Sequence, residues 1–353
     1  MAIATAVRRL LAWYDKNKRD LPWRHDRPEP YQVWLSEIML QQTTVAAVES
    51  YYRKFISRWP TVNDLAAAPL DDLLAAWSGL GYYARARNLH KAAEIVAARG
   101  GIFPDTINGL TALPGIGAYT AGAIGAIAFG LKAAAVDANA ERVIARFYAV
   151  RTPIPAARPE IRALADKMVP ADRPGDFAQS LMDLGSMVCT QKPQCADCPL
   201  AKDCAGFAQG IAEILPARAA KSAKPQRRAV AFVVEDGVGR VLLLQRPPKG
   251  LLGGMWQPPM TPLEVPSPGL AEVDAARPFS ARWYRVPGTV RHVFTHFALE
   301  VEVWRAKLSD ASGRGGNLGR WQPQDKLDEV GLPTVMRKIL RHGLVAQDSN
   351  LDI

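Results

Sequence analysis

All four cysteines of this 353-residue chain lie in one stretch, CTQKPQCADCPLAKDC, which runs from Cys189 to Cys204. The gaps between successive cysteines are five, two and five residues. A structural zinc site more often has two Cys-x-x-Cys pairs, whereas this stretch has one, from Cys195 to Cys198. Four thiolates in a compact loop can also hold a 4Fe–4S cluster. The spacing therefore indicates a metal-binding loop and leaves zinc and an iron–sulfur cluster open.

The N-terminal segment, MAIATAVRRLLAWYDKNKRD, lacks an apolar run followed by a cleavage site of small residues, and its pattern predicts an amphipathic helix. Residues 120–136 are rich in Ala and Gly and include Lys132, so we expect a buried core helix there and not a membrane span. We therefore expect no membrane association and a cytoplasmic protein, nucleoid-associated if bacterial. Disulfides are rare in that compartment.

The charge of the chain is basic. Lys and Arg outnumber Asp and Glu by 44 to 34, which gives a formal net charge of +10. An excess of this size suits a polyanionic partner such as nucleic acid. A solvated basic surface would have the same composition, so the charge alone does not decide between the two.

The pattern of apolar residues changes once along the chain. From about Ala2 to Cys204 the spacing is helical, and strand signals are nearly absent. Later, AVAFVVED and RVLLLQR flank a Gly-Val-Gly turn and predict a hairpin, HFALEVEVW predicts a strand, and LPTVMRKILRHGL predicts a helix. The chain thus predicts an all-α domain followed by a smaller α+β domain.

A basic segment without aromatic residues separates the two patterns. Its cationic residues are Arg218, Lys221, Lys224, Arg227 and Arg228. We expect a mobile linker that can follow a phosphate backbone. The expected organisation is a helical domain over residues 1–207 with the cysteine loop at 189–204, the linker over 208–228, the α+β domain over 229–345 and a tail over 346–353.

Two glycines stand just before a predicted helix in LPGIGAYTAGAI. Gly115 and Gly117 allow a tight turn whose backbone N–H groups are exposed at a helix N-terminus, which suits a phosphate oxygen. An ordinary turn between two helices explains the same residues, so this stretch alone leaves both open.

Two carboxylates are candidate catalytic groups. Glu37 shares a helical face with apolar residues in YQVWLSEIMLQQTTV, where desolvation would raise the pKa of its carboxyl and make it a general acid. A glutamate that reaches solvent or pairs with a base is the alternative. Asp137 follows an apolar run and precedes a helical pattern, so it reads first as an N-cap, although it could return to the same cleft.

Ordered motifs over nearly the whole chain make it similar to a known family. The helical part resembles the helix–hairpin–helix DNA glycosylases that include endonuclease III, and the whole chain resembles the MutY-type adenine DNA glycosylases. The motifs are LPWR, WLSEIMLQQT, GLGYYARARNLHKAA, LPGIGAYTAGAI, VDANAERV and LPTVMRKIL.

The resemblance implies a base-excision repair enzyme that removes adenine mispaired with 8-oxoguanine or G in duplex DNA. Glu37 would protonate the flipped adenine at N7 and then act as the base for water, while Asp137 would stabilise an oxocarbenium-like sugar. Tyr119 and Asn139 occupy supporting positions of the family.

The resemblance also implies residues that contact DNA. Trp23 and Arg24 would line the adenine pocket, whereas Gln42 and Tyr82 would enter the base stack and help to expel the nucleotide. Gly115 and Gly117 would grip a backbone phosphate.

One position distinguishes this chain from bifunctional relatives. Those enzymes carry a nucleophilic lysine in the hairpin motif, where this chain has Tyr119. We therefore expect a monofunctional glycosylase, with an endonuclease III-like glycosylase/lyase as the nearest enzymatic alternative. A non-catalytic helix–hairpin–helix DNA-binding protein would share the charge and the hairpin but would not need Glu37 with Asp137.

The C-terminal part resembles the Nudix-like module of MutY, and LLGGMWQPPM and RHVFTHFALEVEVW carry that similarity. The chain lacks the glutamate-rich block that binds Mg²⁺ in Nudix hydrolases, so we expect recognition without hydrolysis. The resemblance assigns 8-oxoguanine recognition to Phe294, Thr295 and His296, with Thr where Ser is usual. Packing at a strand edge is the alternative.

The family likeness decides between the two metal sites. It implies a 4Fe–4S cluster held by Cys189, Cys195, Cys198 and Cys204, although the first gap has five residues here and six in the family. We expect a monomer that binds duplex DNA.

Overall fold

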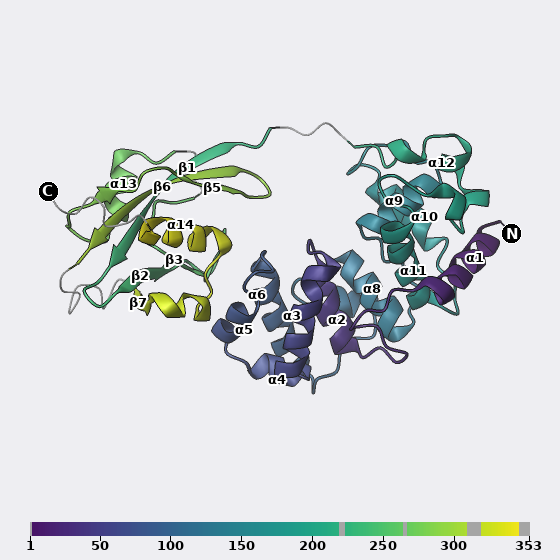
Figure 1. Cartoon of the computed structure of the whole chain (residues 1–353). Helices are drawn as coiled ribbons and strands as arrows, with labels where there is room; N and C mark the ends of the chain where they lie inside the picture. Colours follow the sequence, from purple (N-terminus) through teal and green to yellow (C-terminus); the bar gives the residue numbers. More distant parts are fainter. Residues whose placement is uncertain (1, 219–222, 264–266, 309–318, 346–353) are drawn as a thin grey trace. The chain divides into compact units, whose positions relative to one another are not determined.

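The computed structural model describes residues 2–218, 223–263, 267–308 and 319–345 (Figure 1). They form two compact units, one of Met1–Ala68 with Asn88–Lys221 and the other of Pro69–Arg87 with Ser222–Ile353. The predicted order, a helical domain followed by a smaller α+β domain, is confirmed. Pro69–Arg87, which we expected within the first domain, instead groups with the second unit. Residues 219–222 of the predicted linker and the predicted tail at 346–353 lie outside the described residues.

The first unit is built of helices that pack directly on one another, chiefly α2 on α8, α11 on α8 and α11 on α9. Its α-helices are α1 (Ala2–Asn17), α2 (Pro30–Leu40), α3 (Val45–Arg58), α4 (Val62–Ala67), most of α6 (Ala84–Ala97), α7 (Ile107–Thr111), α8 (Ala118–Phe129), α9 (Ala138–Phe147), α10 (Arg158–Asp166), α11 (Pro174–Met187) and α12 (Ala205–Ala208). Short 3₁₀ turns follow in the cysteine loop and after it: η1 (Cys195–Asp197), η2 (Ala201–Asp203) and η3 (Ala212–Ile214). No helix in the described part of the chain is long and apolar enough to cross a membrane.

Helix α8 is shorter than we expected from residues 120–136. It ends at Phe129 because Gly130 has a left-handed backbone with φ of 64°, which glycine adopts at little cost. The following segment turns back along α8, and a Cβ at Gly122 would lie 2.4 Å from the carbonyl oxygen of Ala134. This close contact fixes the backbone that leads to Asp137.

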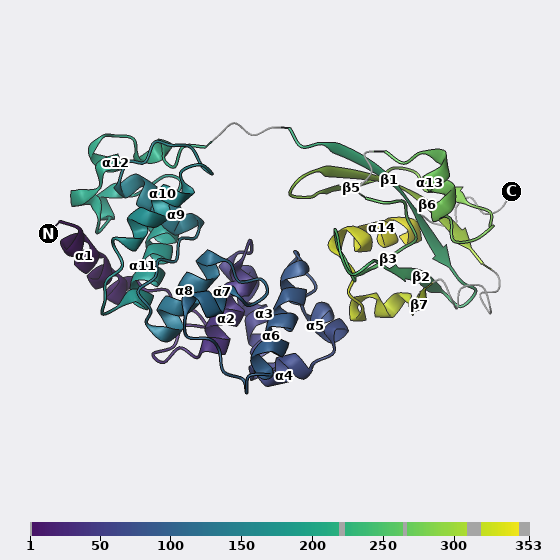
Figure 2. The ribbon, with the colours of Figure 1, turned by 180° about the vertical axis from the view of Figure 1, so that it is seen from behind.

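The second unit contains a mixed sheet in the order β3-β2-β1-β6-β4, in which β5 also pairs with β6 and β7 with β2. Its strands are β1 (Gln226–Glu235), β2 (Arg240–Gln245), β3 (Trp256–Gln257), β4 (Tyr284–Arg285), β5 (Val290–Val293), β6 (Ala298–Lys307) and β7 (Arg320–Pro323). The remaining elements of this unit are α5 (Leu70–Ala76), the start of α6, α13 (Leu270–Ala276), η4 (Gln324–Glu329) and α14 (Thr334–Val345). Figure 2 shows α13 and α14 on opposite sides of the sheet.

Several expectations for this unit are confirmed. β1 and β2 form the predicted antiparallel hairpin, and β6 alternates buried Leu299, Val301 and Val303 with more exposed residues. The linker, however, is shorter than predicted at its C-terminal end. β1 begins at Gln226 and runs parallel to β6, with Gln226 opposite Ala298, so Arg227 and Arg228 belong to the sheet.

Candidate active site and cysteine loop

The Glu37 carboxyl is buried on α2, and the Glu37 residue is only 4% exposed. Tyr119, in the first turn of α8, donates a hydrogen bond of 2.8 Å from its hydroxyl to Glu37 Oε2. Burial raises the pKa of Glu37 to about 7. The Tyr119 hydrogen bond and the charge of Arg24 lower this pKa, while the charge of Asp137 raises it further. A carboxyl with this pKa is substantially protonated near neutral pH, as a general acid requires.

Asp137 is the N-cap of α9. One of its carboxylate oxygens accepts a hydrogen bond of 2.7 Å from the backbone N–H of Ala140, and the other accepts one of 3.1 Å from the Asn139 amide. Burial raises the pKa of Asp137, and these hydrogen bonds oppose that effect. The capping interpretation is therefore correct. The charge of Asp137 also raises the pKa of Glu37, so the two carboxyl groups interact, while the return of Asp137 to the same cleft stays a prediction.

A cavity adjoins Glu37, and the two residues predicted to line a base pocket, Trp23 and Arg24, are in its wall. The Trp23 ring is buried and packs edge-on against Tyr52, with 5.4 Å between ring centroids. The other lining residues are Arg19, Leu21, Val33, Ser36, Leu40, Val45, Ile127, Gln179 and Met182. The wall is mostly apolar with a few polar groups, which is the usual composition of a site for a planar base.

Asp183, on α11, holds Arg24 in place, and sequence reasoning missed it. Its carboxylate is fully buried and accepts two hydrogen bonds from the Arg24 guanidinium, at 2.6 and 2.9 Å. Arg19 adds bonds from its backbone N–H and from Nε, at 3.1 and 2.6 Å. An acidic residue inside the apolar pattern QSLMDLGSM is the sequence signal that could have identified it.

Arg142, also missed, connects the active site with the cysteine loop. Its Nη2 donates to Asn139 Oδ1 at 2.8 Å and to the Gly185 carbonyl at 2.5 Å, and its Nε donates to the Cys189 carbonyl at 2.6 Å. A Cβ at Gly185 would lie 2.6 Å from Asn139 Cβ, so α11 can approach α9 this closely only with glycine there. The side chain that holds Asp137 is thus itself held by Arg142.

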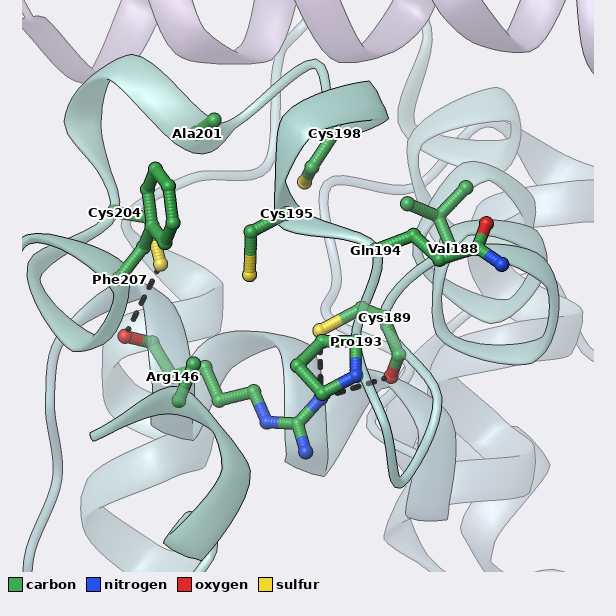
Figure 3. Close-up of a pocket in the computed structure, with 11 residues that line it drawn as sticks. Arg146, Val188, Cys189, Pro193, Gln194, Cys195, Cys198, Ala201, Cys204 and Phe207 are labelled. Atoms are coloured by element: carbon green, nitrogen blue, oxygen red, sulfur yellow. Dashed lines mark hydrogen bonds between the residues drawn. The ribbon is translucent and has the colours of Figure 1, made fainter. Parts of the chain in front are cut away.

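The four cysteines direct their sulfur atoms into one cavity (Figure 3). Val188, Pro193, Ala201, Phe207 and Ala212 form the apolar part of its wall. Within the described ranges, no three His, Cys, Asp or Glu side chains converge on the position of a single metal ion. The four thiols line this cavity together with those apolar side chains.

Arg146, a buried cation on α9, lines the same cavity. Its Nη1 lies 3.3 Å from Cys189 Sγ and donates to the Thr190 carbonyl at 2.5 Å, and its Nε donates to the Leu215 carbonyl at 2.9 Å. A cation and a hydrogen-bond donor beside a thiolate offset the negative charge of a thiolate-ligated centre. Sequence reasoning did not identify Arg146.

Gln42 and Tyr82, predicted to enter a base stack, both have exposed side chains. Each has a left-handed backbone, with φ of 60° at Gln42 and 49° at Tyr82, which costs a non-glycine residue about 1–3 kcal/mol. In the hairpin, only Gly115 has such a conformation, with φ of 79°, because Gly117 has φ of −90°, which any residue adopts. The hairpin turn itself lies between α7 and α8, as predicted.

Residues 294–297 form a tight turn between β5 and β6, which we call the reading loop. The Phe294 N–H donates to the Phe297 carbonyl at 2.8 Å, and their rings stack with centroids 4.7 Å apart. Thr295 and His296 are exposed at its tip, and the Thr295 hydroxyl lies 3.3 Å from the Tyr82 hydroxyl. Phe294 therefore packs at the strand edge, whereas Thr295 and His296 are exposed and the Thr295 hydroxyl shares a hydrogen bond with Tyr82.

Comparison with known proteins gives two domain matches and full-length relatives. Residues 35–171 match the HhH-GPD superfamily of base excision DNA repair proteins, and residues 229–342 match the NUDIX domain. The adenine DNA glycosylase of Mus musculus is 35% identical, over 97% of this chain and 78% of that protein.

Two solved structures share the helical part. A thermostable thymine-DNA glycosylase has a TM-score of 0.54 and 32% identity, over 59% of this chain and 97% of that one. Endonuclease III in a non-covalent DNA complex has a TM-score of 0.50 and 25% identity, over 58% of this chain and 94% of that one.

We expect Asp183→Ala to lower the free energy of unfolding of the helical unit by about 3–5 kcal/mol, because it leaves two arginine charges without their buried partner. Urea unfolding followed by far-UV circular dichroism measures the loss. Asp176→Ala is the matched control on the same helix: its pair with Arg173 is more exposed, and its loss costs about 1 kcal/mol or less. Equal losses in the two variants would contradict the role given to Asp183.

Proposed function

The chain belongs to the MutY-type adenine DNA glycosylases of base-excision repair, and we propose that its substrate is adenine paired with 8-oxoguanine, or with G, in duplex DNA. The observation that carries this proposal is the protonatable Glu37 carboxyl beside Asp137, at a cavity walled by Trp23 and Arg24. The target nucleotide must leave the helix to reach it, because the reacting atoms are inaccessible inside a duplex.

Glu37 acts first as the acid. Adenine is a poor leaving group until it is protonated, and a carboxyl whose pKa is about 7 can give its proton to N7 at neutral pH. Tyr119 holds Glu37 Oε2 in one orientation by its hydrogen bond. After the base departs, the Glu37 carboxylate accepts a proton from the attacking water, as the paired carboxylates of sugar hydrolases do.

Asp137 supplies the negative charge that stabilises the cationic sugar. The Asn139 amide, the Ala140 N–H and the N-terminus of α9 all favour its ionised form. In this proposal Glu37 is the proton donor and Asp137 is the anion. Both are desolvated, but Glu37 accepts a hydrogen bond from Tyr119, whereas Asp137 accepts hydrogen bonds at both of its oxygens.

The enzyme is monofunctional in this proposal. Tyr119 stands where bifunctional relatives carry a nucleophilic lysine, and its hydroxyl is occupied by Glu37. A phenol cannot form a Schiff base with the sugar.

The reading loop recognises the base opposite adenine. The Thr295 hydroxyl can donate and accept a hydrogen bond, which suits a lesion that differs from guanine in its N7 proton and O8 oxygen. Thr295 and His296 are exposed at the tip of the loop, where a base can approach them.

Cys189, Cys195, Cys198 and Cys204 would hold a 4Fe–4S cluster, as is typical of the endonuclease III and MutY relatives. When bound, the cluster supplies a structural crosslink of the loop and takes no part in bond cleavage. Burial raises the pKa of the Cys198 thiol to about 12, so this ligand needs a cationic centre to ionise. The proposed complex is one copy of the chain, with its cluster, bound to one DNA duplex.

We expect Glu37→Gln to reduce single-turnover adenine release from an 8-oxoguanine:A duplex by about 100-fold or more, since it removes the proton donor. In the wild type, the rate should fall as the pH rises through about 7, because the acid form of Glu37 is lost in that range. Duplex binding by the variant, measured in parallel, controls for folding. No adenine release by the wild type, or efficient borohydride trapping through an essential lysine, would overturn the proposal.

Thr295→Ala combined with His296→Ala should lower the preference for 8-oxoguanine:A over G:A by about tenfold, because the hydrogen-bonding groups at the loop tip are removed. Release of adenine from G:A should remain measurable. Val293→Ala, at an exposed position of β5 next to the loop, is the control and should keep the preference. Unchanged discrimination in the double variant would rule out this role.

Purified protein should contain iron and no zinc, with a broad visible absorption band from the cluster. Cys195→Ser should lose iron and the band, because one of four ligands is removed. Metal analysis and absorption measure this independently of catalysis. Stoichiometric zinc without iron would show that the loop is a zinc site.

A further inference from the structure

We propose that Lys224, at the C-terminal end of the interdomain linker, and Arg227, at the start of β1, position the reading loop and so determine mismatch specificity. This inference rests on the proposed recognition of 8-oxoguanine. Both residues were expected to follow a phosphate backbone. In the structure, Lys224 contacts Phe294 and Arg227 contacts Phe297.

Lys224 holds the loop at its first residue. Its Nζ donates a hydrogen bond of 2.8 Å to the Phe294 carbonyl oxygen. That carbonyl belongs to the peptide group that joins Phe294 to Thr295, so the bond orients the backbone immediately before the recognition side chain. A charge-assisted hydrogen bond is stronger than a neutral one and more demanding in geometry.

Pro225, the residue after Lys224, contacts the residue that follows the loop, Ala298. The Ala298 N–H donates to the Pro225 carbonyl at 2.9 Å, and the parallel pairing of β1 with β6 starts at the next residue, with Gln226 opposite Ala298. Figure 2 shows the start of β1 beside the β5–β6 hairpin. The end of the linker is therefore built into the same sheet edge as the loop.

Arg227 holds the loop at its last residue. Its guanidinium carbon lies 4.2 Å from the centroid of the Phe297 ring, and its Nη1 donates to the Leu263 carbonyl at 3.0 Å. Phe297 is buried and stacks on Phe294. A cation–π contact at this distance is favourable and helps to fix the pair of rings on which the loop rests.

These contacts leave the tip of the loop as its exposed part. With Phe294 held through its carbonyl and Phe297 through its ring, the backbone can place Thr295 and His296 in only a narrow range of positions. A recognition group must be held within about 0.5 Å of its productive geometry by the residues behind it. Loss of the two basic side chains should therefore act on discrimination more than on stability.

The experiment measures single-turnover adenine release by the full chain from 8-oxoguanine:A and G:A duplexes. Lys224→Ala with Arg227→Met should reduce the ratio of the two rates about threefold to tenfold, through slower release from the 8-oxoguanine duplex. Lys224→Arg keeps a hydrogen-bond donor at this position, so this single variant should keep the wild-type ratio of the two rates. Arg228→Ala is the matched control, because Arg228 is adjacent, 75% exposed, and paired with Glu300 at 3.9 Å.

The outcomes separate the inference from the proposed function. A wild type that releases adenine equally fast from both duplexes would refute 8-oxoguanine recognition itself. A wild type that discriminates, with a double variant that discriminates equally well, would overturn the role of Lys224 and Arg227. An equal loss on both duplexes, steeper at high salt, would also overturn it, because that is the signature of phosphate binding.

Discussion

Burial of the Glu37 carboxyl is the constraint on which the active site depends. Desolvation raises its pKa more than any neighbour does, and the other charges of the site adjust that effect. The positive charge of Arg24 lowers the pKa of Glu37, because a nearby cation favours the carboxylate over the acid. Asp183 binds Arg24 through both carboxylate oxygens, so the charge of the guanidinium in the cavity wall is paired with a buried carboxylate. Asp183 on α11 thus holds the cation that contributes to the pKa of Glu37 on α2.

Helix α9 explains why a cysteine loop belongs beside such a site. A helix of ten residues is marginal by itself and depends on tertiary contacts. Asp137 caps its first turn, and Arg142 and Arg146, four residues apart on one face, both donate to the carbonyl of Cys189. A rigid loop thus immobilises the helix that carries the catalytic aspartate. The loop acts on the chemistry through position, and its own groups stay outside the reaction.

Glu37 and Asp137 stand out in the sequence because each breaks a local pattern: an acid among apolar residues, and an acid between an apolar run and a helix. Those patterns alone favour ordinary roles, and the family likeness is what predicts their part in catalysis. The sequence was sufficient for the hairpin, the alternation in β6 and the order of the two domains. Asp183, Arg142 and Arg146 were missed because a charged residue on a helix has many ordinary explanations, and each has partners that are distant in the sequence, such as Arg24 for Asp183 and the Cys189 carbonyl for both arginines. The end of α8 was misplaced because apolar composition continued past Gly130, where only the backbone conformation stops the helix.

The reading loop belongs to the second unit as a whole and not to the α+β domain alone. Lys224 reaches Phe294 from the linker, and the Tyr82 hydroxyl reaches Thr295 from Pro69–Arg87, a segment that precedes the hairpin in the sequence. Neither residue lies within residues 229–345, so the domain boundary inferred from composition excludes two groups that hold its recognition residues. Tyr82 also has a strained backbone, and such a conformation persists only where contacts with the surrounding structure hold it. The loop and the residues that contact it are therefore distributed over three separate stretches of the chain.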